Sequence, residues 1–203
     1  MNIDRVMRMA PVIPVLVVKD VAHSLPVAQA LVNGGLPVLE VTLRTEAALD
    51  VIREMSKCEG SFVGAGTVLN EKQLDAAIDA GAKFIVSPGL TTPLAEAAIE
   101  RGIPFLPGIA TAADIMRGLD LGLDRFKFFP AETSGGIKAL KALAAPFYQA
   151  RFCPTGGITA ETAPDWLALD AVLCVGGSWL VPAGEPDPTG IEARASACRA
   201  FVR

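Results

Sequence analysis

The chain has 203 residues and a mass of 21.2 kDa, a length that predicts a single domain spanning residues 1–203. Hydrophobic residues make up 51% and charged residues 20%, which excludes an intrinsically disordered chain. A net charge of −4 and a pI near 5.1 argue against nucleic acid as a partner, because such a partner requires a basic surface. The one histidine, His23, excludes a multi-histidine metal site and is itself expected to be an ordinary helix residue.

The amino-terminal region carries arginines ahead of the apolar run Met9–Val18, as a signal peptide does. Pro11 and Pro14 interrupt this run and Lys19 closes it, so a β-strand is the preferred interpretation. The uncharged run Val21–Leu39 is also broken by proline and glycine, and no transmembrane helix or membrane partner is predicted. The four cysteines form no Cys-x-x-Cys pair, which is typical of a reduced, cytoplasmic protein.

Short runs rich in valine, isoleucine and phenylalanine recur every 21 to 26 residues, with helical patterns between them. Eight strands alternating with helices predict an α/β fold with parallel strands, either a closed (β/α)8 barrel or a doubly wound sheet. A final helix is expected over residues Ile191–Val202. The strands are expected to begin near Val12, Val38, Phe62, Lys83, Pro104, Arg125, Arg151 and Val172.

Glycine-rich turns are predicted after several strands, at the edge of a parallel sheet where ligands bind. Two Gly-Gly pairs, Gly156-Gly157 and Gly176-Gly177, follow the last two strands. Glycine lets backbone N–H groups approach an anion, and a helix beginning after the turn adds a positive dipole. The pairs therefore indicate a phosphate site, with tight turns alone as the alternative. The other turns are Gly64-Ala65-Gly66-Thr67, Ser87-Pro88-Gly89 and Pro107-Gly108.

Lys127 differs from the other six lysines because it lies inside a strand, between Phe126 and Phe128. Side chains alternate along a strand, so Lys127 and Phe129 share the face opposite Phe126 and Phe128. Burial disfavours the charged form of an amine, and Schiff-base chemistry requires the neutral form. The strand alone leaves two roles open for Lys127, an imine-forming nucleophile or one half of a buried ion pair. Lys19 is expected to be solvated or salt-bridged.

Glu40 is the candidate partner of Lys127, because it lies between two apolar residues near the carboxyl end of the second strand. The alternative for Glu40 is a core ion pair with an arginine. Arg44 follows where the strand gives way to a loop, and a guanidinium there suits a bidentate grip on a substrate carboxylate. The alternative for Arg44 is a salt bridge to Glu40 or Glu46.

Five motifs follow one another in a familiar order: Glu40–Glu46, Gly64–Leu69, Ser87–Gly89, Phe126–Glu132 and Phe152–Ile158. Together they resemble the 2-keto-3-deoxy-6-phosphogluconate (KDPG) and 4-hydroxy-2-oxoglutarate (KHG) aldolases. The resemblance extends from about Pro11 to Pro182. It implies a (β/α)8 TIM barrel, a cytoplasmic homotrimer without metal or other cofactor, and a place in the Entner–Doudoroff pathway.

The resemblance also implies a role for each matched residue. Lys127 matches the Schiff-base lysine and Glu40 the general acid/base, while Arg44 and Thr67 match residues that hold the pyruvyl carboxylate. The implied reaction is the class I cleavage of KDPG to pyruvate and glyceraldehyde 3-phosphate. The remaining matches contact the substrate at Pro88, Phe129 and Thr155, and its phosphate at Gly156, Gly157, Gly177 and Ser178.

Other functions remain as alternatives. KHG and the galactonate-series epimer of KDPG are alternative substrates, although the Gly-Gly pairs favour a phosphorylated sugar acid. A non-catalytic phosphosugar-binding barrel, or a purely structural trimer, would not need Lys127. A metal-dependent aldolase would need clustered Asp, Glu or His at the strand ends, where only Glu40 is well placed.

Overall fold

The computed structural model of the protein describes residues 1–201. Within that range the chain forms nine short strands, which run parallel wherever they pair. The α/β fold with parallel strands that the repeating pattern predicts is confirmed. The strands are β1 (Val12–Leu16), β2 (Val38–Thr42), β3 (Phe62–Gly66), β4 (Ile85–Val86), β5 (Phe105–Leu106), β6 (Gly108–Ile109), β7 (Arg125–Phe128), β8 (Arg151–Pro154) and β9 (Val175–Gly177).

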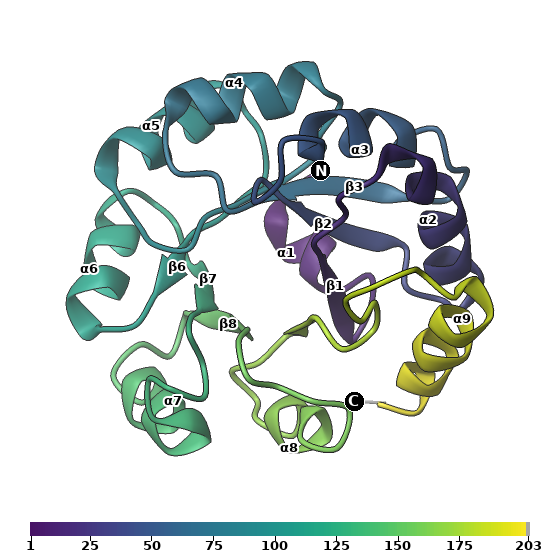
Figure 1. Cartoon of the computed structure of the whole chain (residues 1–203). Helices are drawn as coiled ribbons and strands as arrows, with labels where there is room; N and C mark the ends of the chain where they lie inside the picture. The colour runs from purple at the N-terminus through teal and green to yellow at the C-terminus, as the bar shows by residue number, and fades with distance from the viewer. Residues whose placement is uncertain (202–203) are drawn as a thin grey trace.

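The strands are organised in two parallel sheets. The larger sheet has the order β5-β4-β3-β2-β1-β9, and the smaller one has the order β6-β7-β8. Isolated parallel bridges, Phe152 to Val172 and Thr155 to Gly176, link β8 to the chain around β9. Figure 1 shows the two sheets curled around a common centre with most helices outside them. Because the strands run in one direction, their carboxyl ends meet at one end of the fold.

The predicted fifth strand is divided into β5 and β6 by Pro107. Proline has no N–H to donate to a neighbouring strand, which breaks the regular ladder. Its carbonyl still accepts a hydrogen bond from the Lys127 N–H at 2.8 Å, so β7 remains paired there. Two other strands begin later than expected, β4 at Ile85 and β9 at Val175.

Helices separate most of the strands, as the sequence pattern predicts. Helix α6 has the clearest start: the Thr111 hydroxyl accepts from the Asp114 N–H, and the Asp114 carboxylate accepts from the Thr111 N–H. Such a capping box satisfies donors that a helix start leaves unpaired. The helices are α1 (Ile3–Met7), α2 (Ser24–Asn33), α3 (Ala48–Met55), α4 (Glu71–Asp79), α5 (Thr92–Glu100), α6 (Ala112–Asp120), α7 (Gly136–Ala144), α8 (Ala163–Leu167) and α9 (Pro188–Ala197).

The ends of the chain differ from the sequence-based expectation. The final helix begins earlier than Ile191, because Pro188 occupies its first position, and it ends at Ala197 with a 3-10 turn after it. Val202, the expected last residue of this helix, lies outside the described residues. Helix α1 was not predicted, since five residues are too few to show a helical period.

Buried side chains form two clusters. The larger includes Phe126 and Phe128, which pack against residues of the surrounding helices. The smaller lies between the strands and α1, and it contains Val6 and Met7 together with strand residues such as Ile13. Val6 and Met7 are fully buried, which stabilises the fold by about 1.5–3 kcal/mol for each side chain.

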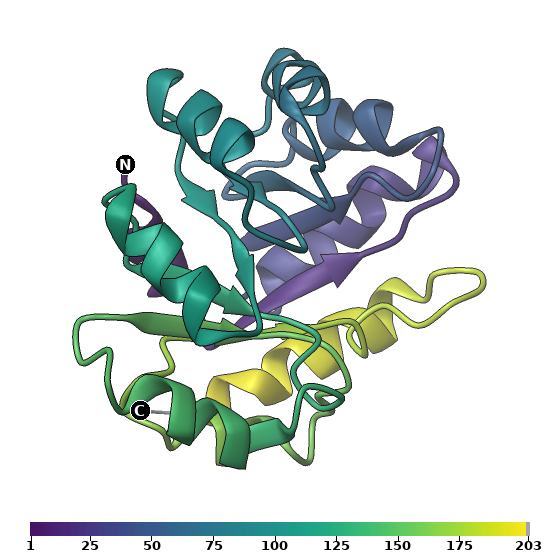
Figure 2. The same ribbon diagram turned by 90° about the vertical axis from the view of Figure 1, so that its left-hand side faces the viewer.

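Helix α1 and the residue 182–187 loop lie at opposite ends of the molecule in Figure 2.

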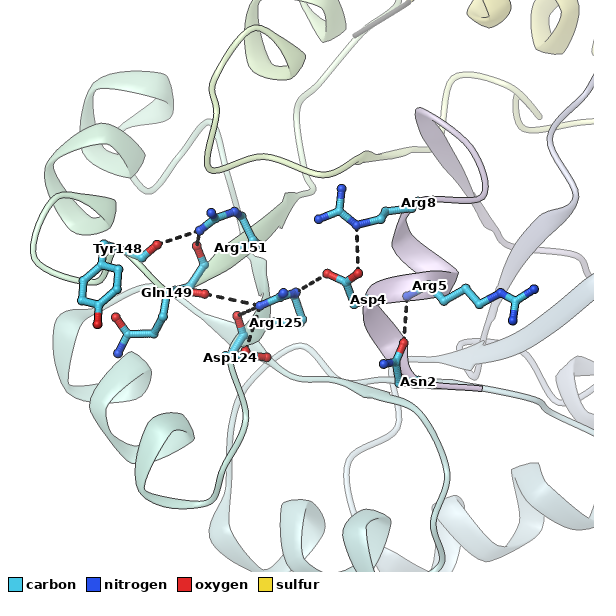
Figure 3. Close-up of polar contacts among 10 residues, drawn as sticks. Asn2, Asp4, Arg5, Arg8, Asp124, Arg125, Tyr148, Gln149 and Arg151 are labelled. Carbon is cyan, nitrogen blue, oxygen red and sulfur yellow. Dashed lines mark hydrogen bonds and ion pairs between the residues drawn. The ribbon is translucent and has the colours of Figure 1, made fainter.

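A polar network attaches α1 to the strands at their amino ends (Figure 3). Asp4 accepts hydrogen bonds from Arg125 Nε at 2.6 Å and from Arg8 Nε at 2.8 Å. The Arg125 guanidinium also donates to the carbonyls of Asp124 and Gln149. Since Arg125 is the first residue of β7, the network holds the start of the strand that carries Lys127.

The Asp4 network makes stability depend on pH. Burial raises the pKa of Asp4, but hydrogen bonds from Arg8 and Arg125 outweigh burial and hold that pKa below its ordinary value of 3.8. A carboxylate with a lowered pKa contributes stability above its unfolded pKa and loses it as pH falls through the folded pKa. Asp4→Asn should therefore lower the urea midpoint at neutral pH, and the difference should shrink below about pH 4. Urea titrations across this range measure it.

Asp79→Asn is the matched control, because Asp79 is an exposed helix carboxylate. We expect its urea midpoint to follow that of the unmodified chain at every pH. If the urea midpoint of Asp4→Asn were lowered by the same amount at every pH, the ionised carboxylate of Asp4 would not be what holds α1.

Candidate active site

Lys127 and Glu40 meet in the interior of the fold. Lys127 Nζ donates a hydrogen bond to Glu40 Oε1 at 2.9 Å, although the residues are 87 positions apart and belong to different sheets. Lys127 is 5% exposed and Glu40 is 3% exposed. Buried charges require a partner, because removing an ion from water costs several kcal/mol. The structure thus brings together the two residues that the sequence singled out for chemistry.

The alternation predicted along β7 is observed. Phe126 and Phe128 are fully buried in the larger cluster, and the Phe128 ring lies 6.3 Å from that of Trp166 in α8. Lys127 points the other way, and its Nζ lies 5.5 Å from the centre of the Phe129 ring. A cation so close to an aromatic face gains about 0.5–2 kcal/mol. The half-buried Phe129 therefore forms one wall around the lysine amine.

Gly66 provides the space that the Glu40 carboxylate occupies. A Cβ atom on Gly66 would lie 2.6 Å from Cγ and 2.8 Å from the carboxyl carbon of Glu40, so any side chain there would displace it. The sequence predicted Gly64–Thr67 as a turn, but Gly66 is the last residue of strand β3. Glycine inside a strand indicates a close approach by another group, and that signal was present in the sequence.

Arg44 and Thr67 contact each other beside the Lys127–Glu40 pair. Arg44 Nε donates to Thr67 Oγ1 at 3.3 Å, and Thr67 adopts a left-handed backbone with φ 59°. That conformation is rare for a β-branched residue and costs about 1–3 kcal/mol, and such strain is concentrated at functional sites. Among the described residues Arg44 forms no ion pair with Glu40 or Glu46, which leaves its guanidinium exposed for a ligand.

Pro88 lies in the turn after β4. The neighbouring Ser87 is buried, and its hydroxyl donates to the Gly89 carbonyl at 2.6 Å, which closes the turn. A Cβ on Gly108 would be 2.8 Å from the Gly89 nitrogen and still nearer to the Pro88 carbonyl, so Gly108 lets β6 approach this turn. Pro88 is half-buried as a result.

Thr155 follows β8 and is 6% exposed. It pairs with Gly176, on which a Cβ would lie 2.7 Å from the Thr155 methyl group and nearer still to its hydroxyl oxygen. Gly156 and Gly157 then turn the chain with φ values of 104° and 79°, which glycine adopts at no steric cost. The first pair therefore forms a turn, whereas Gly176-Gly177 lies within β9 and gives Thr155 its space.

The helix dipole expected beside the glycine pairs is not found there. In the described part of the chain, the next helix after Gly157 is α8, which begins at Ala163 and has five residues. Ser178 is followed by turns up to α9. A helix dipole therefore adds little at either glycine pair.

A cavity of about 520 Å³ opens at the carboxyl ends of β1 and β9. Val15 and Ser178 are among the residues that line it, and Val15 is paired in register with Glu40. His23 also lines it, from a 3-10 turn rather than a regular helix, and its Nε2 is 3.1 Å from Glu185 Oε1. Lys19 also lines the cavity and is exposed, as expected.

The cysteines are a further set of reactive groups, and one of them, Cys153, lies with its Sγ 3.9 Å from Thr155 Oγ1. All four cysteines are buried, and burial raises the pKa of the Cys198 thiol to about 11, which makes it a weak nucleophile. Residues 1–201 contain no group of three or more His, Cys, Asp or Glu side chains placed to hold a metal ion. Each helix in this range is too short or too polar to cross a membrane.

Three comparisons with known proteins point to the same family. The family model described as "KDPG and KHG aldolase" matches residues 3–193. A 2-dehydro-3-deoxy-phosphogluconate aldolase of Zymomonas mobilis is 59% identical over 202 residues, which cover 100% of this chain and 97% of that protein. The crystal structure of a Zymomonas mobilis KDPG aldolase with 3-phosphoglycerate matches with a TM-score of 0.98 at 59% identity, over 100% of this chain and 97% of that one.

A more distant solved structure is also similar. The KDPG aldolase of Legionella pneumophila, with pyruvate captured as a covalent carbinolamine intermediate, is 41% identical and has a TM-score of 0.93. The match covers 100% of this chain and 99% of that one.

Removing one partner of the buried Lys127–Glu40 pair should destabilise the protein more than removing both partners. Glu40→Leu and Lys127→Met each leave a buried charge without its partner, and each should lower the free energy of unfolding by about 3 kcal/mol. The double variant has apolar groups at both positions, so it should be more stable than either single variant. Urea denaturation of the four proteins measures this, and additive losses in the double variant would contradict it.

Proposed function

We propose, because the chain belongs to the family of KDPG and KHG aldolases, that it is a class I aldolase that cleaves KDPG to pyruvate and glyceraldehyde 3-phosphate. The observation that carries this proposal is the contact of Lys127 Nζ with Glu40 Oε1 at 2.9 Å inside the fold. An amine that forms a Schiff base needs a neighbour that takes and returns protons, and Glu40 is within hydrogen-bond reach.

The first half of the reaction forms the covalent intermediate. Glu40 accepts a proton from the Lys127 ammonium, and the neutral amine attacks the C2 carbonyl carbon of the substrate. Glu40 gives its proton to the carbonyl oxygen, which becomes the hydroxyl group of a carbinolamine, and the attacking nitrogen, now positively charged, gives one of its protons to Glu40. Glu40 then gives a proton to this hydroxyl group, which leaves as water, and the nitrogen lone pair forms the iminium.

The second half breaks the carbon–carbon bond. Glu40, directly or through a water molecule, removes the proton of the C4 hydroxyl. The C3–C4 electrons move into the iminium, and glyceraldehyde 3-phosphate leaves with an enamine remaining on Lys127. Protonation at C3 restores an iminium, and water adds at C2 to release pyruvate and the free amine. This mechanism uses no metal or other cofactor, because the iminium accepts the electrons.

Two groups of residues surround the reacting carbons in this proposal. Arg44 and Thr67, joined at 3.3 Å, hold the pyruvyl carboxylate, and the charge-assisted hydrogen bonds of a guanidinium suit that task. Pro88, Phe129 and Thr155 contact the carbon chain. The phosphate of the substrate lies at the turns after β8 and β9, bound by Gly156, Gly157, Gly177 and Ser178.

The choice of substrate follows from these turns. The Gly156-Gly157 turn and the glycine-rich end of β9, with their backbone N–H groups, favour a phosphorylated sugar acid, and KHG and the galactonate-series epimer are the other candidate substrates. A non-catalytic phosphosugar-binding protein is the candidate from a different class, and it would not retain a buried Lys127–Glu40 contact. The family resemblance further supports a single domain with a closed (β/α)8 barrel, assembly as a homotrimer, and a cytoplasmic role in the Entner–Doudoroff pathway.

Borohydride reduction in the presence of pyruvate tests the proposed chemistry. A reduced pyruvyl adduct should form on Lys127, because the imine is the obligatory intermediate, and intact mass with peptide mapping locates it. Lys127→Met should form no adduct, whereas Lys19→Ala should form as much as the unmodified chain. A folded protein without any adduct would refute the class I assignment, and an adduct on Lys19 would reassign the nucleophile.

Gly66→Ala tests whether the position of the Glu40 carboxylate is critical. The new methyl group must push Glu40 away from Lys127, and displacement of a catalytic group by about 1 Å can reduce the rate about 100-fold. We therefore expect kcat for KDPG cleavage to fall by about that factor while circular dichroism stays unchanged. A kcat within about twofold of the unmodified value would show that Gly66 has no such role.

A further inference from the structure

Glu132 lies in the turn after β7 and has no task in the mechanism above. Its Oε1 accepts a hydrogen bond from Trp166 Nε1 at 3.1 Å. Trp166 belongs to α8, is fully buried, and packs against Phe128. A buried indole N–H requires an acceptor, and the otherwise exposed Glu132 supplies it. The contact ties the turn after β7 to α8, which lies beyond β8 along the chain (Figure 1).

The backbone of the same turn is paired with the turn after β8. The Ala131 N–H donates to the Thr155 carbonyl at 2.8 Å, and the Glu132 N–H donates to the Gly156 carbonyl at 3.1 Å. These bonds continue the β7–β8 pairing beyond the last residues of both strands. Glu132 is therefore attached to the turn proposed to bind phosphate by its main chain as well as to α8 by its side chain.

The stem of Glu132 also fills the space next to Gly157. A Cβ on Gly157 would lie 2.6 Å from Cγ and 2.7 Å from Cβ of Glu132, closer than two carbon atoms can pack. The side chain thus lies against Gly157 while its carboxylate is held at Trp166. A carboxylate free to approach a phosphate would repel it, and the indole N–H restrains this one at α8.

We propose that Glu132 is a positioning residue for the phosphate end of the site. Anchored by Trp166, it holds the Gly156-Gly157 turn in the shape that receives the phosphate of the substrate. This inference rests on the proposed function, and it concerns only the phosphorylated half of the substrate. Pyruvate carries no phosphate, so its imine formation on Lys127 should not depend on Glu132.

Steady-state kinetics of Glu132→Ala tests this role. Loss of the anchor should raise KM for KDPG about 10-fold, because the binding free energy lost is about that of one hydrogen bond. The value of kcat should stay within about twofold of the unmodified value. The inhibition constant of inorganic phosphate should rise in parallel. Glu132→Gln retains the stem and an oxygen that accepts from Trp166, so both constants should return to within about twofold of the unmodified values. The rate of borohydride trapping with pyruvate should be unchanged in both variants.

Two further variants serve as controls. Glu161→Ala removes an exposed carboxylate from the same β8–α8 connection and should leave KM unchanged. Trp166→Phe removes the N–H donor together with part of the buried indole ring, and combining it with a Glu132 substitution should add no further increase in KM. If Glu132→Ala does not fold, Trp166→Phe compared with Glu132→Gln provides the same test.

The outcomes separate this inference from the proposed function. An unchanged KM in Glu132→Ala, or an equal loss in KM, kcat and pyruvate trapping, would overturn the positioning role and leave the aldolase reaction in place. If the unmodified chain forms no pyruvate imine, the proposed function fails instead. Calorimetric binding of inorganic phosphate to the same variants then decides whether Glu132 supports an anion site.

Discussion

The buried contact between Lys127 and Glu40 is the constraint on which the rest of the site depends. Each side chain alone would be an uncompensated charge in an apolar interior, which costs several kcal/mol. The strands β2 and β7 belong to different sheets, so the contact exists only when the two sheets curl around one centre. The same arrangement that makes the pair tolerable excludes bulk water from it, which strengthens its electrostatics and suits proton transfer.

Glycine positions, which carry no side chain, determine the shape of this site as much as the side chains do. Gly66 leaves room for the Glu40 carboxylate, Gly176 for Thr155 and Gly157 for the stem of Glu132. At Gly66 and Gly176 the backbone is ordinary strand, so the requirement for glycine is one of space. At Gly157 the left-handed backbone adds a second reason. The residues around the proposed substrate are therefore held by close packing between neighbouring strands.

The two ends of the strands have different tasks. At the amino ends, Val6 and Met7 of α1 belong to the smaller cluster, and Asp4 ties α1 to Arg125. At the carboxyl ends lie the strained Thr67, the exposed Arg44 and the Gly156-Gly157 turn. Parallel strands bring all turns of one kind to one end, so the residues that anchor α1 and the residues proposed for the chemistry lie at different points of the same strand, as Arg125 and Lys127 of β7 show.

The sequence by itself determined the local features. Strand spacing predicted the parallel α/β fold, and alternation along Arg125–Phe128 placed Lys127 opposite the two phenylalanines, because both patterns repeat over a few residues. Ordered motifs indicated the family. Tertiary structure confirmed that Glu40, the candidate from the sequence, reaches Lys127, and it decided that Arg44 contacts Thr67 and that the Glu40 carboxylate fills the space beside Gly66. These are contacts between distant segments: some are set by the pairing of β2 with β3 in one sheet, and the contact of Lys127 with Glu40 is set only when the two sheets curl around a common centre.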